Sequence, residues 1–456
     1  MNKHIDISET IDRTSVSALQ KRAIALLVVL AVLDGFDAMM LGYAVPSIAR
    51  DWGANAAEFG VVLSASATAM VCGSILFGSL SDRFGRRRVI LTGTVLFSLF
   101  TLLTAFAPSM SILIALRIVT GLALGGVTPN LIAMGSEFSP SRIRSTVVTV
   151  LISAMSMGGF IGGIIAAVLV PNHGWKALFL VGGALPLVAA LAAARWLPES
   201  IAYVATSGDR EGCAQLVRAI DPCARITSDV VFVYAADEAP EKASVARLFT
   251  PGRGAATLAV WAVFFINYLM LYFMMGWMPT LFEDAGMSTA SASTATALFA
   301  LGGVVGGISF GRLADRLGNP ARVAVGSYFF AAVFIVVTAM VMGVSSGLTL
   351  LGVFVTGCGV LGSLALMNVI AATIYPTSIR GAGLGWALGM GRLGSISGPA
   401  MGAVALAMGV GASAVFSLMA VPALFAMPML MVVVRHHKTS AGLRNGSDRP
   451  AAAPNP

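Results

Sequence analysis

GSLSDRFGRRR, at residues 78–88, returns in a shorter form as GRLADRLGN at residues 311–319, 233 positions later. A second motif, PSRIR at 140–144, returns as PTSIR at 376–380, 236 positions later. Two motifs repeated at nearly the same offset indicate an internal duplication. The sequence therefore predicts two related halves joined by a polar segment at residues 197–254.

Apolar runs dominate both halves. Apolar residues make up 57% of the chain and charged residues 11%, against about 45–50% and about 25% in soluble domains. A helix needs about 20 apolar residues to cross a bilayer, and helices satisfy their own backbone groups there. We therefore expect an all-α membrane protein of twelve transmembrane helices in two pseudo-symmetric six-helix halves. The runs are 23–49, 59–80, 89–107, 111–135, 145–170, 175–196, 255–277, 289–311, 321–343, 346–372, 381–408 and 412–434.

The basic residues predict how the chain lies in the membrane. Lys and Arg gather in alternate connections and in both termini, whereas Arg50 and Lys176 lie on the other side. This asymmetry places both termini in the cytoplasm and accounts for the net charge of +8 without nucleic acid. The expected segments are a cytoplasmic tail (1–22), a first half (23–196), a central cytoplasmic loop (197–254), a second half (255–434) and a disordered cytoplasmic tail (435–456).

Four ionisable residues interrupt the apolar runs. Asp34 and Asp37 lie three positions apart and share a helix face, while Arg117 and Arg392 enter from other helices. At 1.5 Å per residue, all four fall in the middle third of the membrane. Charges there are costly and usually functional. An arginine that only locks helices together needs one carboxylate, so a pair suggests a site that takes up and releases protons; buried structural salt bridges remain the alternative.

Several motifs resemble a known family. GSLSDRFGRRR, its degenerate copy, RIVTGLALGG at 117–126 and LPES at 197–200 are similar to signatures of the major facilitator superfamily. DGFD at 34–37, followed by PSIARDWG, resembles the aromatic acid:proton symporter family of bacteria, whose members include 4-hydroxybenzoate and benzoate transporters. The resemblance implies the major facilitator fold in the bacterial inner membrane and proton-driven import of benzoate-like acids by alternating access.

The polar residues of the spans suggest roles in such import. We expect Asp34 and Asp37 to carry the coupling proton and Arg392 to bind the substrate carboxylate, because its planar fork matches two oxygens. Arg117 either pairs with Asp37 or assists in binding. Tyr268 and Tyr272 share a helix face that suits an aromatic ring, although lipid-facing packing would explain them too. Further cavity candidates, which could instead only bond neighbouring helices, are Tyr43, Asn130, Asn267, Asn368 and Trp386.

The two repeated loops suggest a conformational latch. Their glycines permit tight turns, and their acids can pair with arginines or cap a helix; a plain cluster of orienting charges is the alternative. The expected gating residues are Gly78, Asp82, Arg83, Gly85, Arg86, Asp315, Arg316, Glu137 and Arg144.

Other functions fit the sequence less well. GVSSG at 343–347 matches a nucleophile pattern, but that pattern needs a strand-to-helix elbow, and no histidine lies in a span. An enzyme is therefore not expected, nor are a metal, a cofactor or a nucleic-acid partner. The expected partners are an aromatic acid, protons and lipid, with the chain acting as a monomer. The alternatives are an importer of another organic anion such as a dicarboxylate, a drug exporter, or an aromatic-acid receptor.

Overall fold

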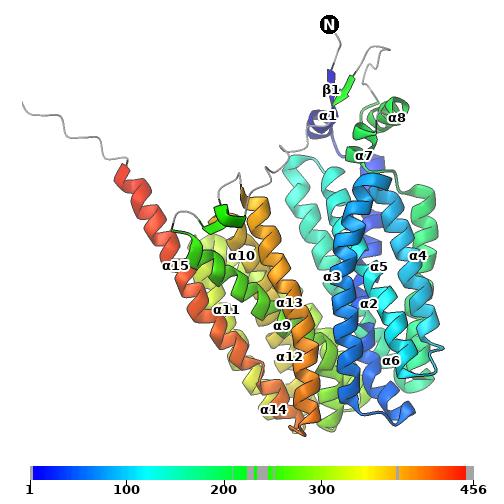
Figure 1. Ribbon diagram of the computed structural model, residues 1–456, viewed down its shortest axis with the longest axis vertical. Coiled ribbons are helices and arrows are strands. Elements are labelled where there is room, and N and C mark those ends of the chain that lie inside the picture. Colours follow the sequence, from blue (N-terminus) through cyan, green and yellow to red (C-terminus); the bar gives the residue numbers. More distant parts are fainter. Residues whose placement is uncertain are drawn as a thin grey trace, which may run out of the picture.

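The computed structural model describes residues 4–207, 209–222, 231–233, 245–249, 252–375 and 379–447. Its first half consists of long helices that follow one another with short connections (Figure 1). They are α2 (Ala18–Trp52), α3 (Phe59–Phe84), α4 (Arg86–Thr104), α5 (Met110–Glu137) and α6 (Ser141–Trp196).

The second half repeats this arrangement. Its helices are α9 (Gly254–Asp284), α10 (Thr289–Leu317), α11 (Pro320–Val341), α12 (Ser346–Ile374), α13 (Arg380–Ala407), α14 (Ala412–Ser417) and α15 (Ala420–Ser447). The last helix reaches into the tail that was expected to be disordered from residue 435, and residues 448–456 lie outside the described residues.

The twelve predicted spans are confirmed. Ten of the described helices are long and apolar enough to cross a membrane. One of these, α6, holds two predicted spans, because Gly174 breaks its helical geometry with φ 75° and ψ 170° between them. The twelfth span is α13, whose sequence is rich in glycine and contains Arg392.

The packing shows the duplication directly. In the first half α2 packs on α6 and α3 packs on α5; in the second half α9 packs on α13 and α10 packs on α12. Glycines on the facing surfaces allow these helices to approach closely. A β carbon on Gly158 would overlap the carbonyl of Val32 on α2, and one on Gly306 would overlap the carbonyl of Cys358 on α12.

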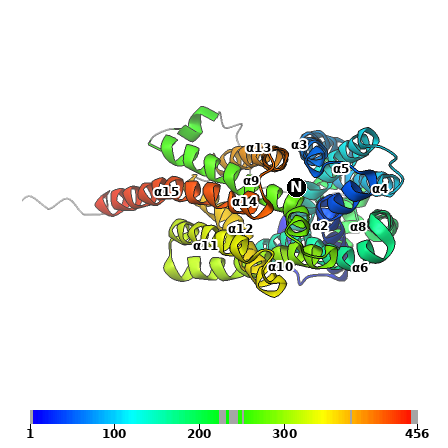
Figure 2. The same cartoon turned by 90° about the horizontal axis from the view of Figure 1, so that it is seen from below.

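The two halves meet through α3 with α13, α6 with α10, and α2 with α9, as Figure 2 also shows. These contacts gather at the end opposite the chain's N-terminus (Figure 1). We call that end the closed end, and the end where α2 begins and α15 ends the tail end. At the closed end Arg50 of α2 forms an ion pair with Glu283 of α9 at 3.1 Å and a hydrogen bond to Thr289 of α10.

The segments on either side of the first half pack together at the tail end. Strands β1 (His4–Asp6) and β2 (Val231–Val233) pair in parallel, and α1 (Ile7–Arg13) contacts α8 (Arg210–Ile220). The backbone N–H of Ser141 donates to Asp12 Oδ1 at 2.6 Å, which joins this layer to the start of α6. The segment that joins the two halves, between α6 and α9, also contains α7 (Ile201–Thr206) and the 3₁₀ helix η2 (Val245–Phe249).

Candidate functional site

Asp37 lies in a complete set of polar contacts between α2, α4 and α5. The residue is 2% exposed. Thr101 Oγ1 donates to Asp37 Oδ1 at 2.6 Å, and Arg117 Nη2 lies 3.3 Å from Asp37 Oδ2. The same arginine nitrogen donates to Thr101 Oγ1 at 3.1 Å, and its guanidinium stands over the ring of Phe179. Both oxygens of Asp37 are therefore paired, as the buried charge of an ion pair requires.

Asp34 lies one helical turn closer to the tail end, and its contacts are incomplete. It too is 2% exposed. Thr128 Oγ1 of α5 donates to Asp34 Oδ2 at 2.8 Å. Its other oxygen, Oδ1, is buried and has no hydrogen-bond partner among the described residues. A buried carboxylate oxygen without a hydrogen-bond partner is costly, so the contacts of Asp34 compensate its burial less well than those of Asp37 do.

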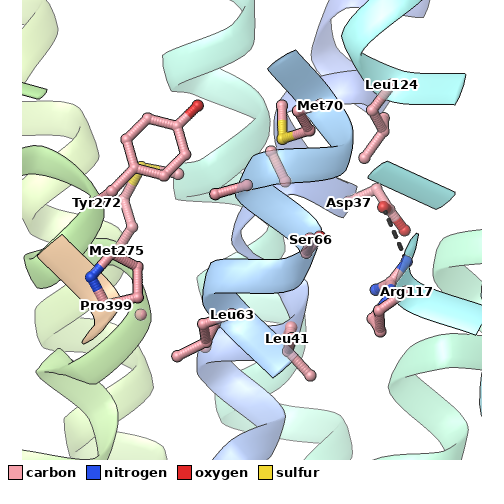
Figure 3. Close-up of a pocket in the computed structure, with 14 residues that line it drawn as sticks. Asp37, Leu41, Leu63, Ser66, Met70, Arg117, Leu124, Tyr272, Met275 and Pro399 are labelled. Atoms are coloured by element: carbon pink, nitrogen blue, oxygen red, sulfur yellow. Dashed lines mark hydrogen bonds and ion pairs between the residues drawn. The ribbon is translucent and has the colours of Figure 1, made fainter. Parts of the chain in front are cut away.

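A cavity opens between the halves beside this pair. The cavity is open on one side, and its volume is about 510 Å³ when the adjoining solvent space is included. In Figure 3 Tyr272 of the second half and the paired Asp37 and Arg117 of the first lie on opposite sides of it. The remaining lining is mostly apolar or small and comes from α2, α3, α5, α9 and α13: Ala38, Leu41, Gly42, Leu63, Ser66, Ala67, Met70, Leu124, Met275, Gly276 and Pro399.

A second polar layer lies on the tail-end side of this cavity. Asp34 and Thr128 belong to the first half, and Tyr268 and Arg392 to the second. None of the four lines the cavity itself. The charge of Arg392 nevertheless acts on Asp34 and on Tyr268. The layer thus brings a carboxylate, a guanidinium and a phenol to one level of the bundle.

Arg392 differs from Arg117 in having no fixed partner. It is half-buried on α13, and no hydrogen bond or ion pair reaches its guanidinium from the residues that the structure describes. Tyr268 packs against Gly391, the residue before Arg392, since a β carbon on that glycine would lie 2.9 Å from the tyrosine ring. Tyr268 also stacks on Tyr272, with ring centroids 6.2 Å apart and planes 14° from parallel. A free guanidinium beside two stacked rings can bind an anion that carries a ring.

The other cavity candidates contact neighbouring helices or their own helix. None of them lines the cavity. Tyr43 is buried and donates to the carbonyl of Gly159 on α6, and Asn267 donates to Tyr328 and to the carbonyl of Val360. Asn130 and Asn368 donate to carbonyls of their own helices, and Trp386 of α13 stacks on Trp261 of α9.

The loop at 78–88 is held by a network of polar contacts. Arg86 pairs with Glu137 at 2.6 Å, and Ser200 Oγ donates to the other oxygen of Glu137 at 2.6 Å. The backbone N–H of Arg87 donates to Glu199. Gly85 has φ 92°, and a side chain there would strike the Glu199 carboxylate. This network ties α3, α4 and α5 to the segment after α6.

The copy of that loop in the second half makes fewer contacts. Asp315 and Arg316 are exposed, and no hydrogen bond or ion pair connects them to described residues. Of the other gating candidates, Gly78 faces open space, Arg83 stands over the ring of Phe84, and Arg144 is half-buried at the start of α6. The side chain of Asp82 lies outside the described residues.

Sequence reasoning missed several residues of these sites: Thr101, Thr128, Arg87, Glu199 and Ser200. Threonines in apolar helices ordinarily bond their own backbone, so nothing in the sequence marked Thr101 and Thr128 as partners of the two carboxylates. Glu199 lies in the LPES motif that was noted above. No cluster of three or more His, Cys, Asp or Glu side chains able to hold a metal ion occurs in the described part of the chain.

Comparisons with known proteins agree with this architecture. The sequence model of the Major Facilitator Superfamily matches residues 27–236 and 260–454. A gallate transporter of Pseudomonas putida is 36% identical and covers 96% of both chains. The 4-hydroxybenzoate transporter PcaK of the same organism is 34% identical over 93% of this chain and 95% of its own. A solved bacterial homologue of the human lysosomal transporter Spinster superposes with a TM-score of 0.66 at 14% identity, covering 92% of this chain and 97% of its own.

Proposed function

The chain belongs to the Major Facilitator Superfamily, and from that membership we propose that it imports an aromatic carboxylate together with a proton across the bacterial inner membrane. It is a multi-pass membrane protein with many apolar helices. The clustering of Lys and Arg at the tail end supports placing that end, with both termini, in the cytoplasm. One chain supplies both halves of the path, which supports action as a monomer.

The contacts between the halves support alternating access. The halves meet at the closed end through Arg50, Glu283 and Thr289, and the polar layer of Asp34 and Arg392 lies on the tail-end side of the cavity. Rocking one half against the other around a site at their interface is the general mechanism of such transporters. In the state described, the closed end is therefore the barrier, and its ion pair must break when the barrier opens.

The arrangement around Arg392 is the observation that carries the proposed substrate class. The guanidinium can receive a carboxylate in a bidentate manner, because no described residue occupies it. Tyr268 beside it, stacked on Tyr272, offers an aromatic face. The relatives are named as transporters of gallate and 4-hydroxybenzoate, acids that combine a carboxylate with a ring, and the two features of the layer match those two parts.

Asp34 supports proton coupling more strongly than Asp37 does. Its unpaired oxygen can take a proton without breaking an ion pair. The charges of Asp37 and Arg392 both act on it, so binding of an anion at Arg392 would remove a positive charge from its surroundings and favour its protonation. In this way substrate and proton bind together.

The test is uptake of labelled 4-hydroxybenzoate into bacterial cells that express the protein, with empty cells as background. We expect saturable uptake that a protonophore abolishes and that unlabelled benzoate and gallate compete with. Succinate should not compete. The Arg392→Ala variant, at equal membrane abundance, should take up far less labelled acid at concentrations near the KM of the wild type.

Three results would contradict the proposal in different ways. Uptake that persists with the protonophore would remove proton coupling. Competition by succinate but not by benzoate would indicate a dicarboxylate importer. Binding of the labelled acid to membranes without any uptake would indicate a receptor.

A further inference from the structure

Thr128 has one proton and two possible acceptors. Its hydroxyl donates to Asp34 Oδ2 at 2.8 Å, and the carbonyl of Leu124, one turn earlier on α5, lies 3.3 Å away. A hydroxyl donates a single hydrogen bond at a time. The shorter contact to Asp34 takes the proton, and the carbonyl of Leu124 is the alternative acceptor.

Two other threonines show what is particular about Thr128. Thr120, on the same helix, bonds only the carbonyl of Leu116, at 3.0 Å. Thr101 donates to Asp37 and accepts from Arg117, so it belongs to a fixed ion pair. Of these three threonines, only Thr128 has both a carboxylate and a carbonyl of its own helix within reach as acceptors. Its hydroxyl can move from one to the other and is never left as a buried unpaired donor, which would be costly.

We propose that Thr128 is a positioning residue that stabilises the ionised form of Asp34 and leaves its other oxygen, Oδ1, to receive the coupling proton. The proposal rests on the proposed function for its role in transport, whereas the hydrogen bond itself can be tested without transport. When Oδ1 takes a proton, the charge that attracts the Thr128 hydroxyl disappears. The hydroxyl then turns to Leu124, so the protonation state of Asp34 reaches the backbone of α5.

The direction of the effect follows from the groups around Asp34. Asp37 on its own helix and Arg392 on α13 act on it by charge. Arg117 of α5 is engaged with Asp37, Tyr268 of α9 lies beside Arg392, and the facing part of α6 has no ionisable residue. A hydrogen bond donated to a carboxylate favours its ionised form. Removing the Thr128 hydroxyl therefore makes Asp34 hold its proton to higher pH.

The direct test is an infrared pH titration of the purified protein in detergent, followed through the carbonyl stretch of protonated carboxyl groups. The component that disappears in Asp34→Asn is assigned to Asp34. We expect Thr128→Val, which keeps the shape and loses the hydroxyl, to move its midpoint up by roughly one pH unit, a tenfold gain in proton affinity. Thr128→Ser should restore the wild-type midpoint, because it keeps the donor.

Thr120→Val is the matched control. It removes a buried hydroxyl from the same helix, one that bonds only its own backbone, and should leave the Asp34 midpoint unchanged. A Thr128→Val midpoint equal to the wild type, or an equal shift in Thr120→Val, would overturn the proposal. In the uptake assay the alkaline limb of the pH profile should move with the infrared midpoint. Failure of uptake with a shifted infrared midpoint would reject the transport function and leave the Thr128 contact standing.

Discussion

Asp34 and Asp37 stand one turn apart on α2 and are equally buried, yet they differ in their partners. Asp37 has both oxygens bonded, one by Thr101 and one by Arg117. Asp34 has one oxygen bonded by Thr128 and the other bare. The arginines differ in the same way, since Arg117 is paired with Asp37, whereas no ion pair reaches Arg392 from the residues that the structure describes. Burial alone therefore does not give a carboxylate its role: Asp37 is held in an ion pair, whereas Asp34 has the contacts that we propose allow its charge to change.

The largest expected effect is the difference in folding stability between a variant of Asp37 and a variant of Asp34. Asp37→Ala leaves Arg117 buried and unpaired, so we expect it to lose about 3–5 kcal/mol of folding free energy. Asp34→Asn removes a poorly paired charge and should change stability by less than about 1 kcal/mol. Both are measured by unfolding of the purified protein in one detergent. Equal losses in the two variants would remove the distinction.

The double variant Asp37→Ala/Arg117→Met serves as the control for that prediction. It removes both charges, so no buried charge is left without a partner. We expect it to recover much of the stability that Asp37→Ala loses. If the double variant loses as much stability as Asp37→Ala and Arg117→Met lose together, the two side chains contribute through packing and not through their charges.

The next effect separates the two arginines by substrate affinity. Charge-assisted hydrogen bonds contribute about 1.5–3 kcal/mol each. Arg392→Ala should therefore raise the apparent KM for 4-hydroxybenzoate by roughly 10- to 100-fold. Arg392→Lys keeps the charge without the planar guanidinium, so its apparent KM should lie between those of the wild type and Arg392→Ala. Saturation curves of uptake at equal membrane abundance give these values. An unchanged KM in Arg392→Ala would show that the carboxylate binds elsewhere.

The smallest effect separates the two threonines. Thr101→Val deprives Asp37 Oδ1 of its donor inside a fixed pair, and we expect a loss of about 1–3 kcal/mol of stability. Thr128→Val should cost less, because Asp34 can take a proton when its donor is gone. Thermal unfolding of the two variants side by side provides the comparison. A Thr128→Val protein less stable than Thr101→Val would contradict the distinction between a fixed Asp37 pair and an Asp34 that can take a proton.

The sequence predicted the large features because they depend on apolar length and on repeated motifs. The twelve spans and the two halves are of this kind, and the structure also brings Asp37 to Arg117, one of the two possibilities considered for that arginine. The sequence could not predict which oxygen of each carboxylate accepts a hydrogen bond, because that depends on the side-chain conformations of Thr101 and Thr128 between the packed helices. Nor could it show that Tyr43 bonds the backbone of α6, since a polar residue in a span looks the same whether it faces a cavity or a neighbouring helix.

The repeated loops show the same limit. GSLSDRFGRRR and GRLADRLGN look equivalent in sequence. Among the residues that the structure describes, only the first has an acidic partner and a serine in place, with Glu137 between Arg86 and Ser200. Those partners come from distant parts of the chain. Their arrangement depends on how α4, α5 and the segment after α6 pack together within the first half, which the sequence of the loop does not contain.

The most direct test of the different roles compares two transport modes in proteoliposomes. Exchange of labelled for unlabelled 4-hydroxybenzoate needs no net proton movement, whereas accumulation driven by an imposed pH gradient does. We expect Asp34→Asn to keep exchange and lose gradient-driven accumulation, and Asp37→Asn to lose both together. Gradient-driven accumulation by Asp34→Asn, or the separation of the two modes in Asp37→Asn instead, would contradict the assignment of the coupling proton to Asp34.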